Sequence, residues 1–336
     1  MAKIRYLNIF DIFSLKKLES HISNGSFFNY TSEIIFYPLK FLNYLLPIRA
    51  KFLSDSYVSI QDGSLKGMLS IKARTNNHKK WRIKRLLLDE NSYEIGEQLI
   101  NYAVSKYGAK GVETVEVEIN SNETDMIDLF SKACGFRYCM DYQFYEIKTA
   151  YYKNRKVNLE SCIIRPFKPS DADSVSGLYN DNIITYYKFP LSKTPKEFGD
   201  SMFKGLYKKS LFKYILEDKF NKQIRGYVQI ETENNHDFVL EIVLLPSFEN
   251  YFEDMLTFAT SQIEKRANKY NLYFRNNKFQ INSNDFESKL SEIDNDLIRT
   301  DMIFVKDFFR QIKEDERLIK PAMIYNELKG KPVYKI

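Results

Sequence analysis

The chain has 336 residues, 44% of them hydrophobic and 28% charged, which is typical of a soluble globular protein with room for two domains of ordinary size. Its formal net charge of +6 is too weak, in a molecule of this length, to indicate nucleic-acid binding. The three cysteines and three histidines lack the paired spacings of a zinc site, and three thiols cannot form a disulfide framework, so we expect no metal and a reducing, cytoplasmic location.

Two features near the N-terminus bear on membranes. Lys3, Arg5 and Asp11 interrupt the first apolar residues, which is not the pattern of a signal peptide. The most apolar stretch, residues 34–48, contains Lys40 and is shorter than the roughly 20 residues of a membrane-spanning helix. We therefore expect no membrane span, and we interpret the stretch either as a buried connecting helix or as an aromatic helix that contacts a surface or a partner.

The first half of the chain mixes strand and helix patterns. An alternating strand is followed by Asp11, a residue suited to capping a helix. A hairpin with a turn at Asp62 and Gly63 comes next, and a segment of helical period then joins the following strand to another, which predicts a parallel, right-handed crossover. The predicted strands are residues 3–10, 56–60, 67–73, 81–88, 112–119 and 136–147, and the predicted helices follow Asp11 and cover residues 95–107 and 123–133.

The second half repeats this order after a polar, basic linker at residues 148–159. Ile4-Arg5 matches Ile164-Arg165 160 positions later, and Asp11 matches Asp171 at the same offset. A period this long indicates duplicated domains rather than a solenoid. The expected strands are residues 162–167, 212–217, 223–231, 238–245, 272–281 and 301–308, and the expected helices start at residue 171 and cover residues 252–269 and 286–293. The predicted division is an N-terminal domain at residues 1–150, a C-terminal domain at residues 160–315 and a tail at residues 316–336.

This order of elements resembles the GNAT superfamily of acyl-CoA-dependent N-acetyltransferases. Two segments carry the resemblance: residues 129–137 (Leu-Phe-Ser-Lys-Ala-Cys-Gly-Phe-Arg) are similar to the family's signature before its last two strands, and residues 95–100 (Ile-Gly-Glu-Gln-Leu-Ile) to the start of its cofactor helix. The first half matches well and the second half in outline. The resemblance implies an α/β fold (α+β mixed sheet) of two GNAT-like domains in tandem, each a twisted mixed sheet flanked by helices around a central β-α-β crossover.

The resemblance also implies a site for acetyl-CoA or another acyl-CoA in the first half. The family's pyrophosphate loop, Arg/Gln-x-x-Gly-x-Gly/Ala, holds an anion with the free amides and the dipole of a helix N-terminus. At residues 91–96, Gly96 keeps the last small position, whereas Asn91 replaces the opening basic or amide residue and Glu94 replaces a glycine. We expect the backbone of residues 86–88 to pair with pantetheine and the next helix start to meet the pyrophosphate. The predicted cofactor residues are Leu86, Leu88, Ser92, Tyr93, Glu94, Ile95, Gly96 and Glu97.

The corresponding loop of the second half, residues 246–254, contains three acids and no glycine. We therefore interpret the second half as a degenerate domain that completes the acceptor cleft or stabilises the first half.

The resemblance implies two catalytic groups. In the family a carboxylate usually takes the proton of the amine, often through water, and a tyrosine before the Gly-Phe strand often protonates the departing thiolate. Phe130 stands at the tyrosine position, so that acid is absent. The remaining candidates are Glu116 as base and Tyr138 as acid. The alternatives are a solvated acidic strand edge that Glu116 shares with Thr114 and Glu118, and a packing or exposed role for Tyr138.

Residues 78–85, His-Lys-Lys-Trp-Arg-Ile-Lys-Arg, form the strongest local cluster of basic side chains. We interpret the run as a solvated hairpin; a contact to the CoA 3′-phosphate, to an acidic substrate or to RNA is the alternative.

The leading hypothesis is an N-acyltransferase that moves an acetyl or other acyl group from acyl-CoA to a primary amine of a small molecule or peptide. The rival is a catalytically inactive GNAT-like protein that binds a protein partner or regulates one, which Phe130, Glu94 and the glycine-free second loop favour. An RNA-associated protein that uses Trp81 and its basic neighbours is a third reading, with nucleic acid the least expected partner.

Overall fold

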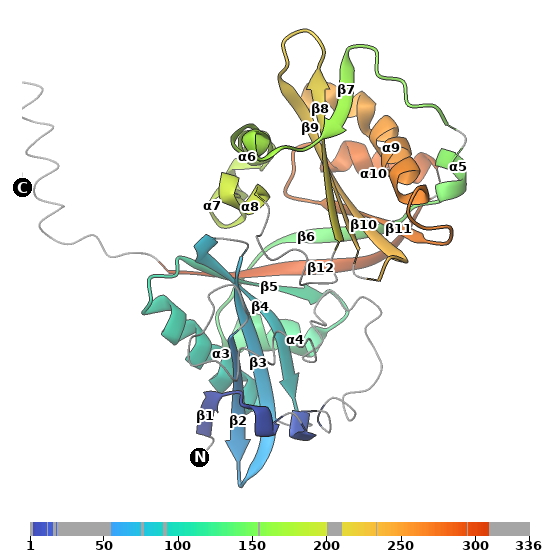
Figure 1. The fold of residues 1–336 in the computed structure, drawn as a ribbon. Coiled ribbons are helices and arrows are strands. Elements are labelled where there is room, and N and C mark those ends of the chain that lie inside the picture. The colour runs from blue at the N-terminus through green and yellow to red at the C-terminus, as the bar shows by residue number, and fades with distance from the viewer. Residues whose placement is uncertain are drawn as a thin grey trace, which may run out of the picture.

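The computed structural model describes residues 3–11, 13–15, 18, 55–74, 77–89, 93–153, 155–199, 210–232, 234–293 and 295–308. Within them, twelve strands form one continuous mixed sheet in the order β1-β2-β3-β4-β5-β12-β6-β11-β10-β9-β8-β7 (Figure 1). None of the described helices is long and apolar enough to cross a membrane. The apolar stretch at residues 34–48, the loop positions Asn91 and Ser92, and the predicted tail lie outside the described residues.

The first half supplies six strands, and its longest helix packs on one face of them. The turn between the second and third strands holds Asp62 and Gly63 at φ values of 51° and 74°, the left-handed region that favours glycine. The strands are β1 (Lys3–Tyr6), β2 (Asp55–Gln61), β3 (Ser64–Arg74), β4 (Asn77–Leu88), β5 (Thr114–Asn120) and β6 (Arg137–Glu146). The helical segments are η1 (Ile9–Asp11), α3 (Tyr93–Gly108), α4 (Thr124–Asp128) and the π-helical turn η2 (Leu129–Ala133). As predicted, β4, α3 and β5 form a parallel crossover.

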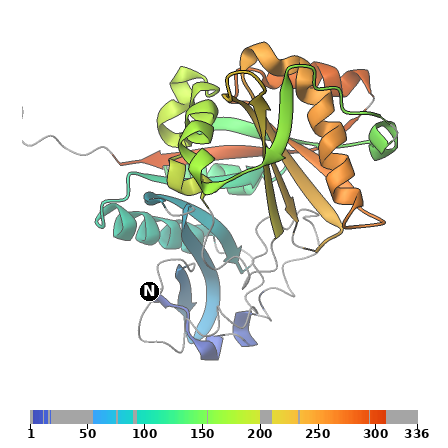
Figure 2. The same cartoon turned by 45° about the horizontal axis from the view of Figure 1, so that its top comes forward.

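The second half supplies the other six strands, with α6 to α8 on one side of them and α9 and α10 on the other (Figures 1 and 2). The strands are β7 (Cys162–Pro166), β8 (Ser210–Asp218), β9 (Ile224–Thr232), β10 (Asp237–Leu244), β11 (Asn271–Asn277) and β12 (Asp296–Asp307). The helical segments are η3 (Pro169–Asp171), α6 (Ala172–Asp181), η4 (Thr185–Tyr187), α7 (Lys188–Leu191), α8 (Pro195–Phe198), η6 (Pro246–Tyr251), α9 (Phe252–Glu264) and α10 (Ser283–Glu292).

Several predicted elements differ from the structure. β1 ends at Tyr6 and α9 ends at Glu264, four and five residues before their predicted ends. The linker contains a helix, α5 (Thr149–Lys153), because Tyr152 is buried in the core of the second half. β11 ends at Asn277, four residues before the predicted end, since the following segment turns toward α6. β12 starts at Asp296, because its first residues pair with the end of β6.

The last strand of each half completes the sheet of the other half. β12 pairs antiparallel with β5, and β6 pairs antiparallel with β11. β6 and β12 also pair with each other, with Tyr142 opposite Asp301 at the centre of the sheet. Figure 1 shows these two strands crossing the middle of the molecule. The two halves are therefore joined by reciprocal strand exchange as well as by the linker.

The repeated sequence corresponds to a repeated structural motif. Arg5 donates from Nη1 and Nη2 to the two carboxylate oxygens of Asp11, at 2.7 and 2.7 Å. Arg165 makes the same two-pronged contact to Asp171, at 2.8 and 3.0 Å. In each half this pair fixes the turn between the first strand and the first helix, since the aspartate also accepts a backbone N–H three residues before it.

Candidate functional site

The parallel strands β4 and β5 run together for only three residue pairs and then diverge. The last pair is Arg82 with Glu116. Beyond it, β4 continues through Leu88 paired with β3. Leu86 and Leu88 lie on this arm, half-buried against the core of the first half. We call the divergence the first fork; among the described residues, its β4 edge has no strand beside it at the place predicted for pantetheine.

Helix α3 begins next to the open end of the first fork. The N–H groups of its first turn have no partner within the helix, and the helix dipole adds positive potential there. Gly96 is buried in this turn: a Cβ at this position would lie 2.8 Å from Leu88 Cδ1 and 3.0 Å from Leu129 Cδ2. Gly96 therefore allows the helix start to lie close against the β4 arm, and any larger residue must displace these leucines.

The other predicted cofactor residues differ in exposure. Tyr93 is 43% exposed and Glu94 is exposed, whereas Ile95 is buried and Glu97 is half-buried. The first-turn amides and the β4 edge suit a pyrophosphate and the amide-bearing arm of CoA, and the Glu94 carboxylate opposes the anion. An acyl-CoA thus fits this chain through backbone groups, with one unfavourable side-chain charge.

Glu116 lies on the face of β5 that is turned away from α3, and it is only 2% exposed. Its two oxygens accept from Arg82 Nε at 2.6 Å and from Arg74 Nη1 at 3.2 Å. Although burial works against the charged form, these two arginines lower the pKa of Glu116 to about 2. The alternative of a solvated acidic edge is wrong, since β5 lies between β4 and β12. A carboxylate with so low a pKa is a weak proton acceptor at neutral pH, which favours a structural role for Glu116.

The structure does not bring Tyr138 to the first fork. Tyr138 lies on β6, and β12 separates β6 from β5. Its ring is 45% exposed and contacts Phe304 edge to face at 5.9 Å. Burial and the nearby Asp141 carboxylate raise the pKa of Tyr138. At the family's tyrosine position, Phe130 is buried and packs edge to face on Phe136 at 5.3 Å.

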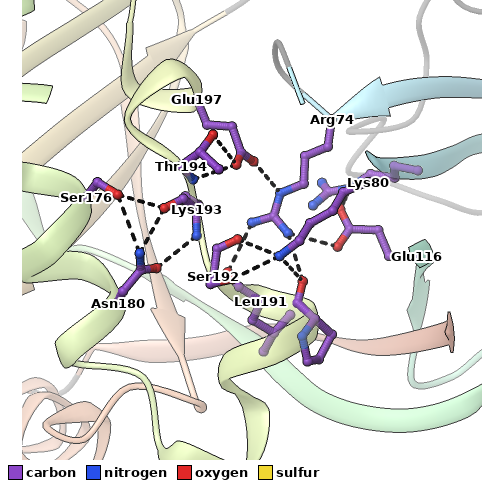
Figure 3. A network of polar contacts seen from close by, with 12 residues as sticks. Arg74, Lys80, Glu116, Ser176, Asn180, Leu191, Ser192, Lys193, Thr194 and Glu197 are labelled. Carbon is purple, nitrogen blue, oxygen red and sulfur yellow. Dashed lines mark hydrogen bonds and ion pairs between the residues drawn. The ribbon is translucent and has the colours of Figure 1, made fainter. Parts of the chain in front are cut away.

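Arg74, at the end of β3, links the two halves next to Glu116 (Figure 3). Its Nε lies 3.3 Å from Glu197 Oε1 on α8, and its guanidinium also donates to backbone carbonyls at the end of α7. Glu197 in turn closes the capping box of α8 with Thr194. The side chains of Arg74 and Glu197 are only 7% and 2% exposed, so this contact is a buried ion pair between the halves.

Lys80, at the start of β4, holds the same segment of the second half (Figure 3). Its Nζ donates to the carbonyls of Phe189, Pro190 and Ser192 at 2.8 to 3.1 Å and to the Ser192 hydroxyl at 3.0 Å. A cation at these carbonyls stabilises the C-terminal end of α7. Burial and then the neighbouring Arg74 lower the pKa of Lys80 to about 8. We call the contacts of Arg74 and Lys80 with α7 and α8 the clamp.

The basic run at residues 78–85 is thus not a solvated hairpin throughout. Lys80 is directed into the interface between the halves, Arg82 pairs with Glu116 and Glu118 of β5, and Lys79 pairs with Glu113 at 2.6 Å. Trp81 packs on Tyr107 with 4.1 Å between ring centroids. The run spreads its side chains over both faces of β4, so it is not a continuous basic and aromatic strip for RNA.

The second half contains an equivalent fork between β10 and β11, whose parallel register ends at Leu240 and Phe274. Here the chain itself enters the fork. Asn282, fully buried, donates from Nδ2 to the carbonyl of Leu244 at the end of β10, at 2.9 Å. Phe279, also fully buried, lies in the same segment. The carbonyl that would meet a pantetheine arm in this half is therefore already bonded to a side chain.

Sequence reasoning missed Arg74 and Glu197, which form an ion pair between the halves, and Lys193, which lies beside Glu241 at the second fork. Arg74 is the last residue of β3, and no motif marks it. The basic run did signal that residues 78–85 matter, but the partners of Lys80 lie more than 100 residues away in sequence.

The chain is similar in structure to several solved proteins. It matches a tandem GNAT protein from the clavulanic acid biosynthesis pathway with a TM-score of 0.60 at 10% identity, covering 93% of this chain and 100% of that one. It matches a GCN5-related N-acetyltransferase from Sphaerobacter thermophilus with a TM-score of 0.56 at 10% identity, covering 93% and 97%, and another from Anabaena variabilis with a TM-score of 0.51 at 13% identity, covering 91% and 73%. No protein-family model and no curated protein matches the sequence. The chain has the tandem GNAT fold, with two GNAT-like halves in one mixed sheet.

Proposed function

We propose that the first half binds acyl-CoA and transfers its acyl group to a primary amine of a small molecule or peptide. The observation that carries this proposal is the first fork, where no described strand pairs with the β4 edge beside the start of α3 and the buried Gly96. The backbone of residues 86–88 would pair with the pantetheine arm, and the amides of Tyr93, Glu94 and Ile95 would bind the pyrophosphate.

A bound acyl-CoA would supply a thioester whose carbonyl carbon the amine nitrogen would attack. The C–N bond would form as the C–S bond breaks, CoA would leave as a thiolate, and the thiolate would take up a proton in exchange for the proton that the amine loses. The chain contributes mainly by holding the two reactants in line, because Phe130 has no proton to donate and Glu116 is engaged by two arginines. Each missing acid or base group is worth typically 10² to 10⁴ in rate, so we expect slow turnover.

The ion pairs of Glu116 also favour a second candidate function, a GNAT-like protein that binds a cofactor or a protein partner without catalysis. In that case, the carboxylate serves the clamp between the halves rather than proton transfer.

Calorimetric titration of the purified chain with acetyl-CoA and with free CoA tests the proposal. We expect one site per chain, lost in Gly96→Arg because the new side chain fills the junction of α3 with Leu88 and Leu129. Gly177→Arg is the matched control: it places the same side chain on a helix where a Cβ meets nothing within 4 Å, and it should bind as the parent does.

The absence of binding at millimolar cofactor would contradict both the cofactor site and the transferase. One site per chain with no thiol release across a panel of primary amines would favour the non-catalytic candidate. Thiol release that depends on the amine, and that is lost in Gly96→Arg, would support acyl transfer.

A further inference from the structure

The Lys193 side chain enters the second fork from the loop between α7 and α8. Its ammonium Nζ lies 3.6 Å from Glu241 Oε1, and its side chain is 18% exposed. Two aromatic rings flank it: the Nζ is 4.0 Å from the centroid of Tyr179 and 5.6 Å from that of Phe198. A carboxylate with aromatic faces is the arrangement that proteins use to bind organic ammonium ions.

Glu241 occupies the mouth of this fork. It follows Leu240, the last residue of β10 in register with β11, and it is 3% exposed. Arg275 Nη2 and Asn277 Nδ2 donate to its two oxygens, the latter at 2.7 Å. Although burial opposes the charged form, Arg275 and Lys193 lower the pKa of Glu241 to about 2, so this carboxylate is charged at neutral pH and is shared between two cations. Burial, together with Arg74 and Arg275, lowers the pKa of Lys193 to about 8.

Lys80, which is also buried, serves as the reference for an ammonium group with a purely structural role in this protein. Lys80 donates hydrogen bonds to four oxygens at 2.8 to 3.1 Å. Within the described residues, the Lys193 ammonium makes no hydrogen bond of that length, and charge and ring faces hold it instead. The Lys193 ammonium is therefore held by the same kinds of contact, a carboxylate and aromatic faces, that hold an organic cation ligand.

We propose that Glu241, Tyr179 and Phe198 form an ammonium-binding site at the second fork, and that Lys193 fills it in place of an external amine. The site takes a primary alkylammonium ion. The inference goes beyond acyl transfer by the first half and does not depend on it, since all the residues of the site belong to the second half.

The clamp gives this site a connection to the first half. The Lys193 backbone is fixed by Asn180, which accepts its N–H at 2.9 Å and donates to its carbonyl at 2.9 Å. The residues on either side, Ser192 and Thr194, belong to the end of α7 and the cap of α8, which Lys80 and Arg74 hold (Figure 3). The first half thus keeps the lysine in the site, and an external amine can enter only if this loop withdraws.

Chemical rescue tests the proposal. Lys193→Ala removes the three carbons and the ammonium beyond Cβ, which together correspond to n-propylammonium. We expect propylammonium chloride to raise the melting temperature of this variant in a saturable way, by about 3 °C or more at tens of millimolar, while 1-propanol and sodium chloride at equal concentration do not.

Two controls define the site. In Lys193→Met the uncharged side chain fills the space, so propylammonium should have no effect beyond that of salt. In Lys193→Ala with Glu241→Gln, the loss of the carboxylate should abolish the rescue. If Lys193→Ala does not fold alone, the readout is the yield of folded chain on refolding with propylammonium compared with propanol.

Equal effects of propylammonium and propanol, or an equal shift in the parent chain and in Lys193→Met, would overturn the proposal. Lys193 would then be a space-filling side chain of the interface rather than the occupant of an ammonium site.

Discussion

The two forks of the molecule arise from the same strand order but differ in what enters them. The first fork, between β4 and β5, opens toward α3, where Gly96 lets the helix approach Leu88. The second fork, between β10 and β11, receives Asn282 on the carbonyl of Leu244 and Lys193 beside Glu241. The difference teaches that a duplicated half can keep its sheet while side chains of the chain itself take the contacts that a ligand would make.

Each fork also has an arginine–glutamate ion pair across its two parallel strands, but the strands that carry the arginine and the glutamate are exchanged. Across β4 and β5, Arg82 donates to Glu116; across β10 and β11, Arg275 donates to Glu241. In both pairs the partners are 34 residues apart. Because the charges are reversed, the carboxylate of the pair lies on β5 at the first fork and on β10 at the second fork, where it also faces the Lys193 ammonium.

Breaking the clamp between the halves should cause the largest loss of stability. Arg74→Met removes the ion pair of Arg74 with Glu197 and leaves Glu116 with Arg82 alone, and breaking a buried ion pair costs about 3 to 5 kcal/mol. Urea unfolding measures this change in the free energy of unfolding. Lys79→Met is the matched control, because Lys79 precedes Lys80 near the start of β4 but its ion pair with Glu113 is exposed and worth about 1 kcal/mol or less. Similar losses in the two variants would show that the clamp does not hold the halves together.

Acid titration compares the two reversed ion pairs. The pKa of Glu116 and that of Glu241 are each lowered from 4.5 to about 2 in the folded chain. The unfolded chain then binds more protons than the folded chain between these values, so stability is present above pH 4.5 and is lost as the pH falls toward 2, by roughly 3 kcal/mol for each carboxylate. Melting temperatures between pH 2 and pH 7 measure this loss. Glu116→Gln and Glu241→Gln should each flatten the curve by about half; a curve unchanged in either variant would show that its carboxylate is not held by its arginine.

Removing the Asn282 side chain from the second fork should cause a smaller loss of stability. Asn282→Ala leaves the buried carbonyl of Leu244 without its side-chain donor, which costs about 1 to 3 kcal/mol. Asn122→Ala, on the exposed turn that follows β5 in the first half, is the matched control and should change stability little. Denaturant unfolding of the two variants measures whether the Asn282 side chain stabilises the second half. Equal free energies of unfolding in the two variants would show that it does not.

The tandem fold was predictable because its signals are local. The repeated Ile-Arg and aspartate, the hairpin turn at Asp62 and Gly63 and the helical period before Gly108 each reflect short-range geometry, and the structure contains each of them. The interface was not predictable, because the exchanged strand β12 reaches β5 across about 180 residues of chain and no local pattern selects that partner. For the same reason Glu116 was predicted as a base or an exposed acid, since Arg74 and Arg82 are neutralising partners only in three dimensions.

The smallest expected effect is a change in cofactor affinity caused by the charge at the start of α3. Glu94 is exposed beside the first-turn amides, and a carboxylate within about 4 Å of a phosphate costs on the order of 1 kcal/mol. Glu94→Gln removes this repulsion and should tighten acetyl-CoA binding about fivefold by calorimetry, with a smaller gain at high salt because salt screens the repulsion. Glu249→Gln makes the same change before α9 of the second half, where the fork is filled, and should leave the affinity unchanged. An equal gain in the two variants would mean that the cofactor responds to the net charge of the chain rather than to the first fork, and a gain only in Glu249→Gln would move the cofactor to the second half.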